Sequence, residues 1–135
     1  MALKAPDRAR CTQALDDLLR RCDSISVAML ALRDGRPYVE RPAAKVAPGK
    51  FAAMASSLVA LGHSVLRELG AGTLDHVLVD GSEGKLVVSS VPGSNGLLIL
   101  ALLARHDARL GLVLGHAKSC ANAISATFAD ERAPA

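Results

Sequence analysis

Aromatic residues are nearly absent from this chain. Its 135 residues include no Trp, one Tyr (Tyr38) and two Phe (Phe51 and Phe128), although half of the residues are hydrophobic. We therefore expect a true core, made mainly of Leu, Val, Ile and Ala. Surfaces that bind single-stranded nucleic acid use aromatic rings on which the bases stack, so the net charge of +3 does not predict nucleic-acid binding.

Long apolar segments are also lacking. The two most hydrophobic stretches, residues 25–32 and 97–104, are each eight residues long, whereas a membrane-spanning helix needs about 18 or more. The first residues show no apolar core of a secretory signal. The three cysteines (Cys11, Cys22 and Cys120) are an odd number without a secretory context. We therefore expect reduced thiols, a cytoplasmic location and no membrane span.

Motifs for nucleotide hydrolysis and nucleophilic catalysis are missing. A P-loop needs Ser or Thr after its Gly-Lys pair, but Phe51 follows Gly49-Lys50, and a Leu follows Gly84-Lys85. The Gly-x-Ser-x-Gly turn that presents a nucleophilic serine does not occur. We therefore expect no catalytic residues, no cofactor and no enzymatic activity.

A metal site is the remaining chemical candidate. His116 and Cys120 are four residues apart and would share a face of the last predicted helix, as Cys11 and Cys22 would on the first. If these helices lie side by side, three or four ligands would meet. There is no CxxC pair, however, and cysteines with apolar neighbours are usually buried core residues. We therefore expect no metal.

Hydrophobic spacing and turn residues predict eight elements in the order α-β-β-α-β-β-β-α, within one domain that spans 1–135 and has its core at about 8–128. Helices are expected over about residues 8–22, 49–70 and 108–128, and strands over 25–32, 36–40, 74–80, 85–91 and 97–104. The Asp34-Gly35 pair marks a hairpin turn. Short Gly-rich connections predict that the last three strands are antiparallel neighbours.

Two of the predicted strands, 25–32 and 97–104, are apolar on both faces. An antiparallel strand has this composition only where both faces of its sheet are covered. The fold class is therefore α+β: a five-stranded antiparallel sheet with helices on both faces. The strand at 85–91 contains Ser89 and Ser90 and is expected nearer an edge, or under a thinner cover.

The central helix has two patterned faces. One is a stripe of large apolar residues, which we expect to cover the sheet: Phe51, Met54, Leu58, Leu61, Val65 and Leu69. Beside it lie four smaller or polar residues: Ala52, Ser56, Val59 and His63. These four allow a second helix to approach closely. The alternative is an Ala-rich helix whose small residues serve only to pack on its own sheet.

Six sequence segments carry a family resemblance through their order and spacing. They are ALRDGRP (31–37), FAAMASSLVAL (51–61), LRELG (66–70), HVLVDG (76–81), GKLVV (84–88) and LLARHDARLGL (102–112). Together they resemble the roadblock (dynein light chain type) family, including its bacterial branch of GTPase regulators in motility and cell polarity. The resemblance implies a roadblock/profilin-like α/β/α sandwich and a non-catalytic homodimer that binds a small Ras-like GTPase, as regulator or scaffold.

In that family the central helix and the next strand form the contact between the two copies, which here implies residues 49–70 and 73–80. An exposed strand edge invites pairing, and a second copy of the same strand would cover it. The expected dimer contacts are Ala52, Ser56, Val59, His63, Leu74, His76, Val77, Leu78 and Val79. The expected GTPase contacts are Lys50, Ser57, Ser64 and Arg67.

Two other functions remain open at the level of sequence. Sheets covered by helices can hold a small molecule between the layers, which would make the chain a ligand-sensing domain of a signalling system. A purely structural subunit that assembles larger complexes is the second alternative. The sequence does not separate these from GTPase regulation.

Overall fold

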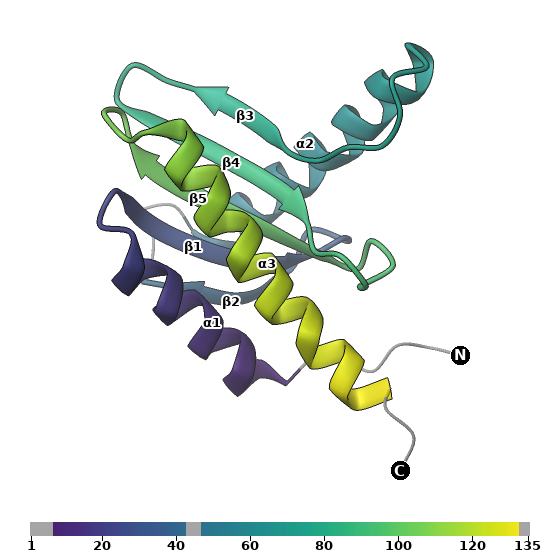
Figure 1. Cartoon of the computed structure of the whole chain (residues 1–135). Coiled ribbons are helices and arrows are strands. Elements are labelled where there is room, and N and C mark those ends of the chain that lie inside the picture. Colours follow the sequence, from purple (N-terminus) through teal and green to yellow (C-terminus); the bar gives the residue numbers. More distant parts are fainter. Residues whose placement is uncertain (1–6, 43–46, 133–135) are drawn as a thin grey trace.

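The computed structural model describes residues 7–42 and 47–132, and side chains as far as Phe128; the remaining parts of the predicted 1–135 domain lie outside the described residues. The observed elements are α1 (Arg8–Arg21), β1 (Ile25–Leu32), β2 (Pro37–Arg41), α2 (Pro48–Glu68), β3 (Val77–Asp80), β4 (Gly84–Ser90), β5 (Leu98–Arg105) and α3 (Leu110–Arg132). Their order confirms the predicted α-β-β-α-β-β-β-α sequence (Figure 1).

The five strands form one antiparallel sheet in the order β2-β1-β5-β4-β3. The two strands that were predicted to be covered on both faces, β1 and β5, lie in its interior, and six of the eight residues in each are buried. The last three strands are antiparallel neighbours, as their short connections predicted. β3 and β2 are the two edges.

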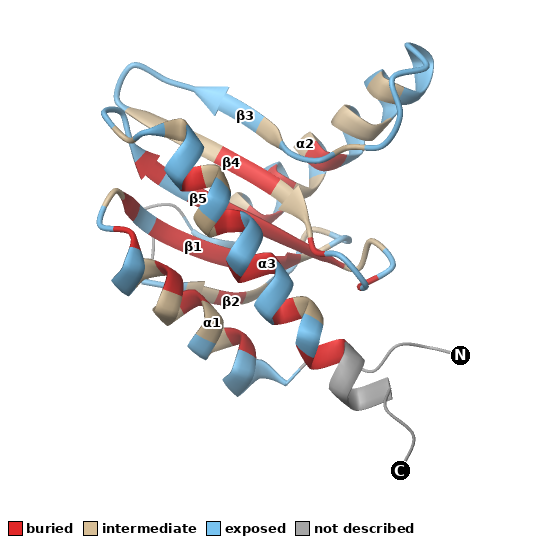
Figure 2. Ribbon diagram, viewed as in Figure 1, coloured by how far each residue is buried: buried red, intermediate tan, exposed pale blue. Residues whose placement is uncertain are grey.

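Helices cover both faces of the sheet, in unequal number. α1 and α3 lie side by side on one face, and α2 lies alone on the other (Figure 1). Alternate residues of each strand therefore enter two separate cores. The larger core lies under α1 and α3, and the smaller core, which includes Met29 and Val88, lies under α2 (Figure 2). Among the described residues, no helix is long and apolar enough to cross a membrane.

Local sequence signals explain how the first three elements begin and end. The Asp7 carboxylate caps α1 by accepting hydrogen bonds from the backbone N–H groups of Ala9 and Arg10. Gly35 turns the chain between β1 and β2 with a φ of +91°, which glycine adopts at little cost. The edge strand β2 starts at Pro37, and its Arg41 forms an ion pair with Asp16 on α1, with an Nε–Oδ1 distance of 2.9 Å.

The orientation of α2 differs from the sequence prediction. Most of the stripe of large residues does not cover the sheet: Met54, Leu61, Val65 and Leu69 are all exposed. The buried positions are instead Ala52, Ala55 and Val59, which lie against the smaller core. Small residues let the helix axis approach the sheet closely, so the small face of α2 packs inward. The prediction of a buried large-residue stripe was therefore wrong for these four residues, whereas Phe51 and Leu58 are half-buried and do pack against the smaller core.

Most other observed element boundaries differ from the predicted ones by one or two residues, but two differ by more. β3 begins at Val77 instead of Leu74, because Leu74 packs against α2 in place of pairing with β4. α3 begins at Leu110 and continues to Arg132, four residues past its predicted end at Phe128.

Candidate functional site: an apolar surface on the second helix and the edge strand

The largest group of exposed apolar side chains lies on α2 and β3, and we call it the α2–β3 surface. The C-terminal half of α2 projects beyond the sheet, and the chain returns from it to the edge strand β3 (Figure 1). The exposed apolar residues of this surface are Met54, Leu61, Val65, Leu69, Leu78 and Val79. Exposed apolar side chains that gather in one region of a soluble protein mark interaction sites.

The edge strand adds unpaired backbone groups to this surface. β3 pairs with β4 on one side, in the register Val77 with Val88 and Asp80 with Lys85. Within the described residues, no strand pairs with its other side. Leu78 and Val79 point to opposite faces of the sheet, so apolar side chains flank the free edge above and below. This confirms the predicted edge position of the strand.

A groove of about 570 Å³ runs between the second half of α2 and the segment that leads into β3. Gly62 makes this approach possible: a Cβ placed there would lie 3.1 Å from both the Leu74 Cδ1 and the Val77 Cγ2 atoms. Leu58, Leu61 and Val65 form the helix wall of the groove. The α2–β3 surface therefore contains a groove in addition to its exposed apolar side chains.

The residues predicted for the dimer contact fall into two groups. On α2, Ala52 and Val59 are buried under the chain's own sheet, and the Ser56 hydroxyl donates a hydrogen bond to the Arg33 carbonyl oxygen at 2.5 Å. For Ala52 and Val59 the alternative interpretation, packing on the sheet, is the one observed. His63 is half-buried. On the segment near the edge, Leu74 and Val77 are half-buried, whereas His76, Leu78 and Val79 are exposed.

The four residues predicted for the partner contact, Lys50, Ser57, Ser64 and Arg67, are all exposed along α2. The Ser57 hydroxyl is occupied locally, because it donates to the Ala53 carbonyl oxygen at 2.9 Å. The sequence reasoning missed Met54, Leu61, Val65 and Leu69 as surface residues because large apolar residues are usually buried. The sequence signal for the correct rotation of α2 about its axis was the stripe of smaller residues formed by Ala52, Ala55, Val59 and Gly62.

The cysteines lie on the other side of the sheet, between α1 and α3. All three are free and buried, and the Cys120 thiol donates a hydrogen bond to the Ala14 carbonyl oxygen at 3.6 Å. Burial, reinforced by the nearby Cys11, raises the pKa of Cys120 to about 12. His116 lines a small cleft together with Cys120. Nowhere in the described part of the chain do three or more metal-ligating side chains gather in a possible metal site.

This environment predicts that Cys120 is unreactive in the folded protein. At pH 8, a thiol with a pKa of about 12 carries about 1,000-fold less thiolate than one with the ordinary value of 9.0, and the thiolate is the nucleophile. Mass spectrometry after iodoacetamide treatment should therefore find Cys120 modified about 100- to 1,000-fold more slowly in the native chain than in urea. A rate within about tenfold of the unfolded chain would contradict this assignment.

Comparison with solved structures shows that other proteins share this fold. The solved structure of Myxococcus xanthus MglB matches 99% of this chain and 98% of its own length with a TM-score of 0.85, at 14% sequence identity. The gliding protein MglB of Thermus thermophilus matches 96% of both chains with a TM-score of 0.78, at 21% identity. An actin-bound profilin, LokiProfilin1, matches 90% of this chain and 98% of its own with a TM-score of 0.59, at 15% identity, which confirms the roadblock/profilin-like fold.

The amino-acid sequence identifies the family. Curated protein sequences gave no significant match. The Roadblock/LC7 domain, however, matches residues 12–104, which is more than half of the chain and includes most of α1, all of α2 and nearly all of the five strands. The chain therefore belongs to the Roadblock/LC7 domain family.

Proposed function

We propose that this protein is a homodimer, joined through the α2–β3 surface, that binds a small Ras-like GTPase and regulates it or holds it in place. The observation that carries the proposal is the coincidence of exposed apolar side chains with a free strand edge in one region. Roadblock/LC7 domains are generally non-catalytic, so an interaction role fits the family. A GTPase partner is what the roadblock resemblance implies, and one solved MglB structure is described as a tetrameric arrangement.

A twofold arrangement suits this surface because an antiparallel strand is complementary to its own copy. Pairing of β3 with β3 of a second chain would satisfy the backbone groups of both edges. The same operation would bring the projecting half of α2 from each chain together, covering Leu61 and Val65. In this proposal Leu78 and Val79 keep their predicted role, and the exposed apolar residues of α2 replace Ala52 and Val59.

The proposed GTPase contact lies on the remaining exposed side of α2. Ser57, Ser64 and Arg67 follow one another at intervals of seven and three residues, so they form a stripe beside the apolar residues. The exposed Ala53 and Ala60 lie in the same stripe. Small side chains leave the helix backbone accessible to a partner, and Arg67 supplies a charge for orientation.

Arg67→Glu is expected to weaken GTPase binding at least about tenfold without dissociating the dimer, because reversing a charge at an interface replaces attraction by repulsion. The measurement is calorimetric titration of Ras-like GTPases encoded near this gene, each loaded with GDP or with a non-hydrolysable GTP analogue. Arg109→Glu, which makes the same change on the opposite side of the sheet, is the control and should bind as the wild type does.

Hydrolysis assays separate the two forms of the proposal. A higher rate of GTP hydrolysis in the presence of the protein identifies a regulator, and an unchanged rate with a stable complex identifies a scaffold. If no GTPase binds in either nucleotide state while the protein is folded and dimeric, the proposed partner class is wrong.

A further inference from the structure

A cleft of about 360 Å³ lies on the face of the sheet opposite α2, between α3, the strand β4 and the segment that leads into β3. Its origin is geometric. Two helices about 10 Å wide cover about 20 Å, whereas five strands with a spacing of about 4.8 Å span about 24 Å. α1 and α3 cover the β2, β1 and β5 side of this face, so the layer of helices ends before the sheet does (Figure 1).

The floor of the cleft is apolar. Val87, which is buried, supplies the strand side, and Leu114, Ala117 and Ala121 supply the helix side. Pro92 closes one end of the cleft, where β4 leads into the next turn. These side chains provide contact for a compact hydrocarbon group but no hydrogen bonds.

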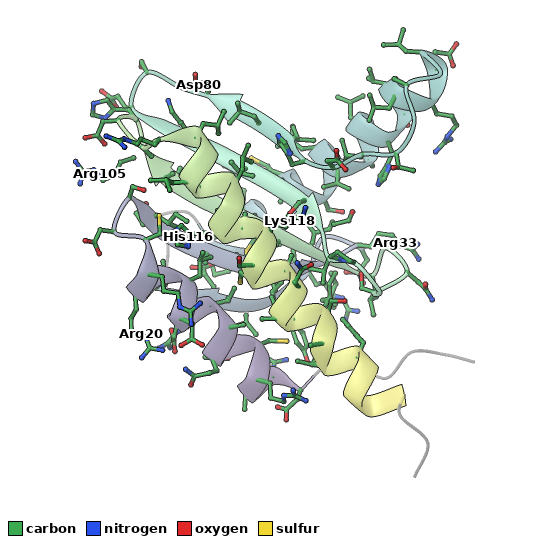
Figure 3. The ribbon with its side chains drawn as sticks, viewed as in Figure 1. Arg20, Arg33, Asp80, Arg105, His116 and Lys118 are labelled. Atoms are coloured by element: carbon green, nitrogen blue, oxygen red, sulfur yellow. The ribbon has the colours of Figure 1, made fainter. Side chains whose placement is uncertain are left out.

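Polar side chains form the walls of the cleft. Lys118 and Asn122 are four residues apart, so they occupy the same side of α3, and Figure 3 shows Lys118 beside the C-terminal end of β4. Val88 belongs to the core under α2, so the next residue, Ser89, points towards α3. By the same alternation His76, which precedes Val77, points to the α3 side.

These polar side chains have no partner within the described part of the chain. None of the hydrogen bonds and ion pairs among described residues involves the side chains of Asp75, His76, Ser89, Lys118 or Asn122. Other charged residues nearby behave differently. For example, Lys85 binds Asp80, with an Nζ–Oδ1 distance of 2.9 Å. Unused donors that converge above an apolar floor are the arrangement found in small-molecule sites.

The charges define the ligand class. Lys118 is the one cation of the cleft lining and Asp75 the one carboxylate, and the side chains of Ser89 and Asn122 add neutral donors. The Asp75 carboxylate disfavours ligands with several negative charges. We infer that this cleft binds a small carboxylic acid with a compact apolar body: the carboxylate on Lys118 and Asn122, and the hydrocarbon on Val87 and Leu114. The acid either has no other charged group or carries an ammonium group that would donate a hydrogen bond to the Asp75 carboxylate.

This inference does not depend on a GTPase partner. The cleft is, however, physically linked to the α2–β3 surface, because Asp75 and His76 line both the cleft and the groove beside α2. A bound acid would therefore contact the segment that leads into the free edge strand.

The test uses three related probes on the full chain: isocaproate, leucine, and isoamylamine, which lacks the carboxylate. Backbone amide NMR shifts are followed up to about 10 mM of each probe, a range that detects dissociation constants of about 1 mM. We expect saturable shifts with isocaproate, leucine or both, confined to residues 75–76, 87–92 and 114–122, and none with isoamylamine. If leucine binds and isocaproate does not, the result would indicate that the leucine ammonium group contacts Asp75.

Two variants and a control locate the site. Lys118→Gln should weaken binding of the carboxylate at least about tenfold, because it removes a charge-assisted hydrogen bond. Ser89→Val should weaken it too, since valine suits a strand but narrows the cleft and removes the hydroxyl. Arg109→Gln, which removes a positive charge outside the cleft, should leave it unchanged. The inference is overturned if no carboxylate probe saturates, if isoamylamine binds equally, or if Lys118→Gln binds as the wild type does.

Discussion

Leu61→Glu is expected to convert the proposed dimer into a monomer of 14.0 kDa, as measured by light scattering after size-exclusion chromatography. Leu61 is 62% exposed in the single chain, so the substitution places its carboxylate in water and leaves the fold intact. In the proposed dimer the same carboxylate would be buried among apolar side chains without a partner. Burial of an unpaired charge costs several kcal/mol, which corresponds to a dissociation constant at least about 100-fold weaker.

The matched control is Leu112→Glu. Leu112 is 56% exposed on α3, on the other face of the sheet, so the same chemical change should leave the dimer intact. Circular dichroism establishes that both variants are folded. A wild-type chain that is monomeric at micromolar concentration, or a Leu61→Glu variant that remains dimeric, would show that the α2–β3 surface does not join two copies.

Leu100→Ala is expected to lower the free energy of unfolding by about 2–5 kcal/mol. Leu100 lies in the central strand β5, is fully buried and pairs with Leu30 in the middle of the sheet, beneath α1 and α3. Its removal leaves a cavity that neighbouring strands, fixed by hydrogen bonds on both sides, cannot close. Urea unfolding of the wild type and the variant, compared at equal protein concentration, measures the effect.

Leu103→Ala provides the comparison for this prediction. Leu103 lies three residues further along the same strand, but on the α2 face, and is 38% exposed. The same substitution there should cost clearly less, because less apolar surface leaves the core. Equal losses at the two positions would mean that the core under α1 and α3 does not contribute more stability than the rim of the sheet.

The fold was predictable because its strongest signals are local. β1 and β5 are apolar on both faces, and only a central position in a covered sheet explains such strands. The Asp34-Gly35 pair and the Gly-rich connections indicated which strands are neighbours. The order of helices and strands then left few alternatives.

The orientation of α2 was not predictable from hydrophobicity, because both of its faces are apolar. The two faces differ in size: Ala52 and Ala55 face the sheet, while Met54 and Leu61 face outward. Hydrophobic spacing identifies a stripe but does not indicate whether the chain's own sheet or a second molecule covers it. The close approach of Gly62 to Leu74 and Val77 is a contact between separate elements that settles this, and no local pattern encodes it.

The cleft beside α3 also depends on long-range geometry. Lys118 and Asn122 resemble ordinary exposed positions of a helix, and Ser89 resembles an ordinary position near a sheet edge. Their convergence follows from where α3 crosses the sheet, a feature that residue spacing along the chain does not define. The sequence allowed a ligand-sensing role in general terms, but only the structure brings particular residues together for it.

The two borders of the sheet have different consequences for assembly. β2 begins with a proline, ends with charged residues and is tied to α1 through Arg41 and Asp16, and such features discourage a further strand from adding there. β3 has a free border flanked by apolar side chains. Two copies that pair through β3 form a closed dimer, because each copy has one free strand edge and the pairing uses both of them. A fibre that grows by strand pairing needs two free strand edges on every molecule, and the β2 edge of this sheet does not provide the second one.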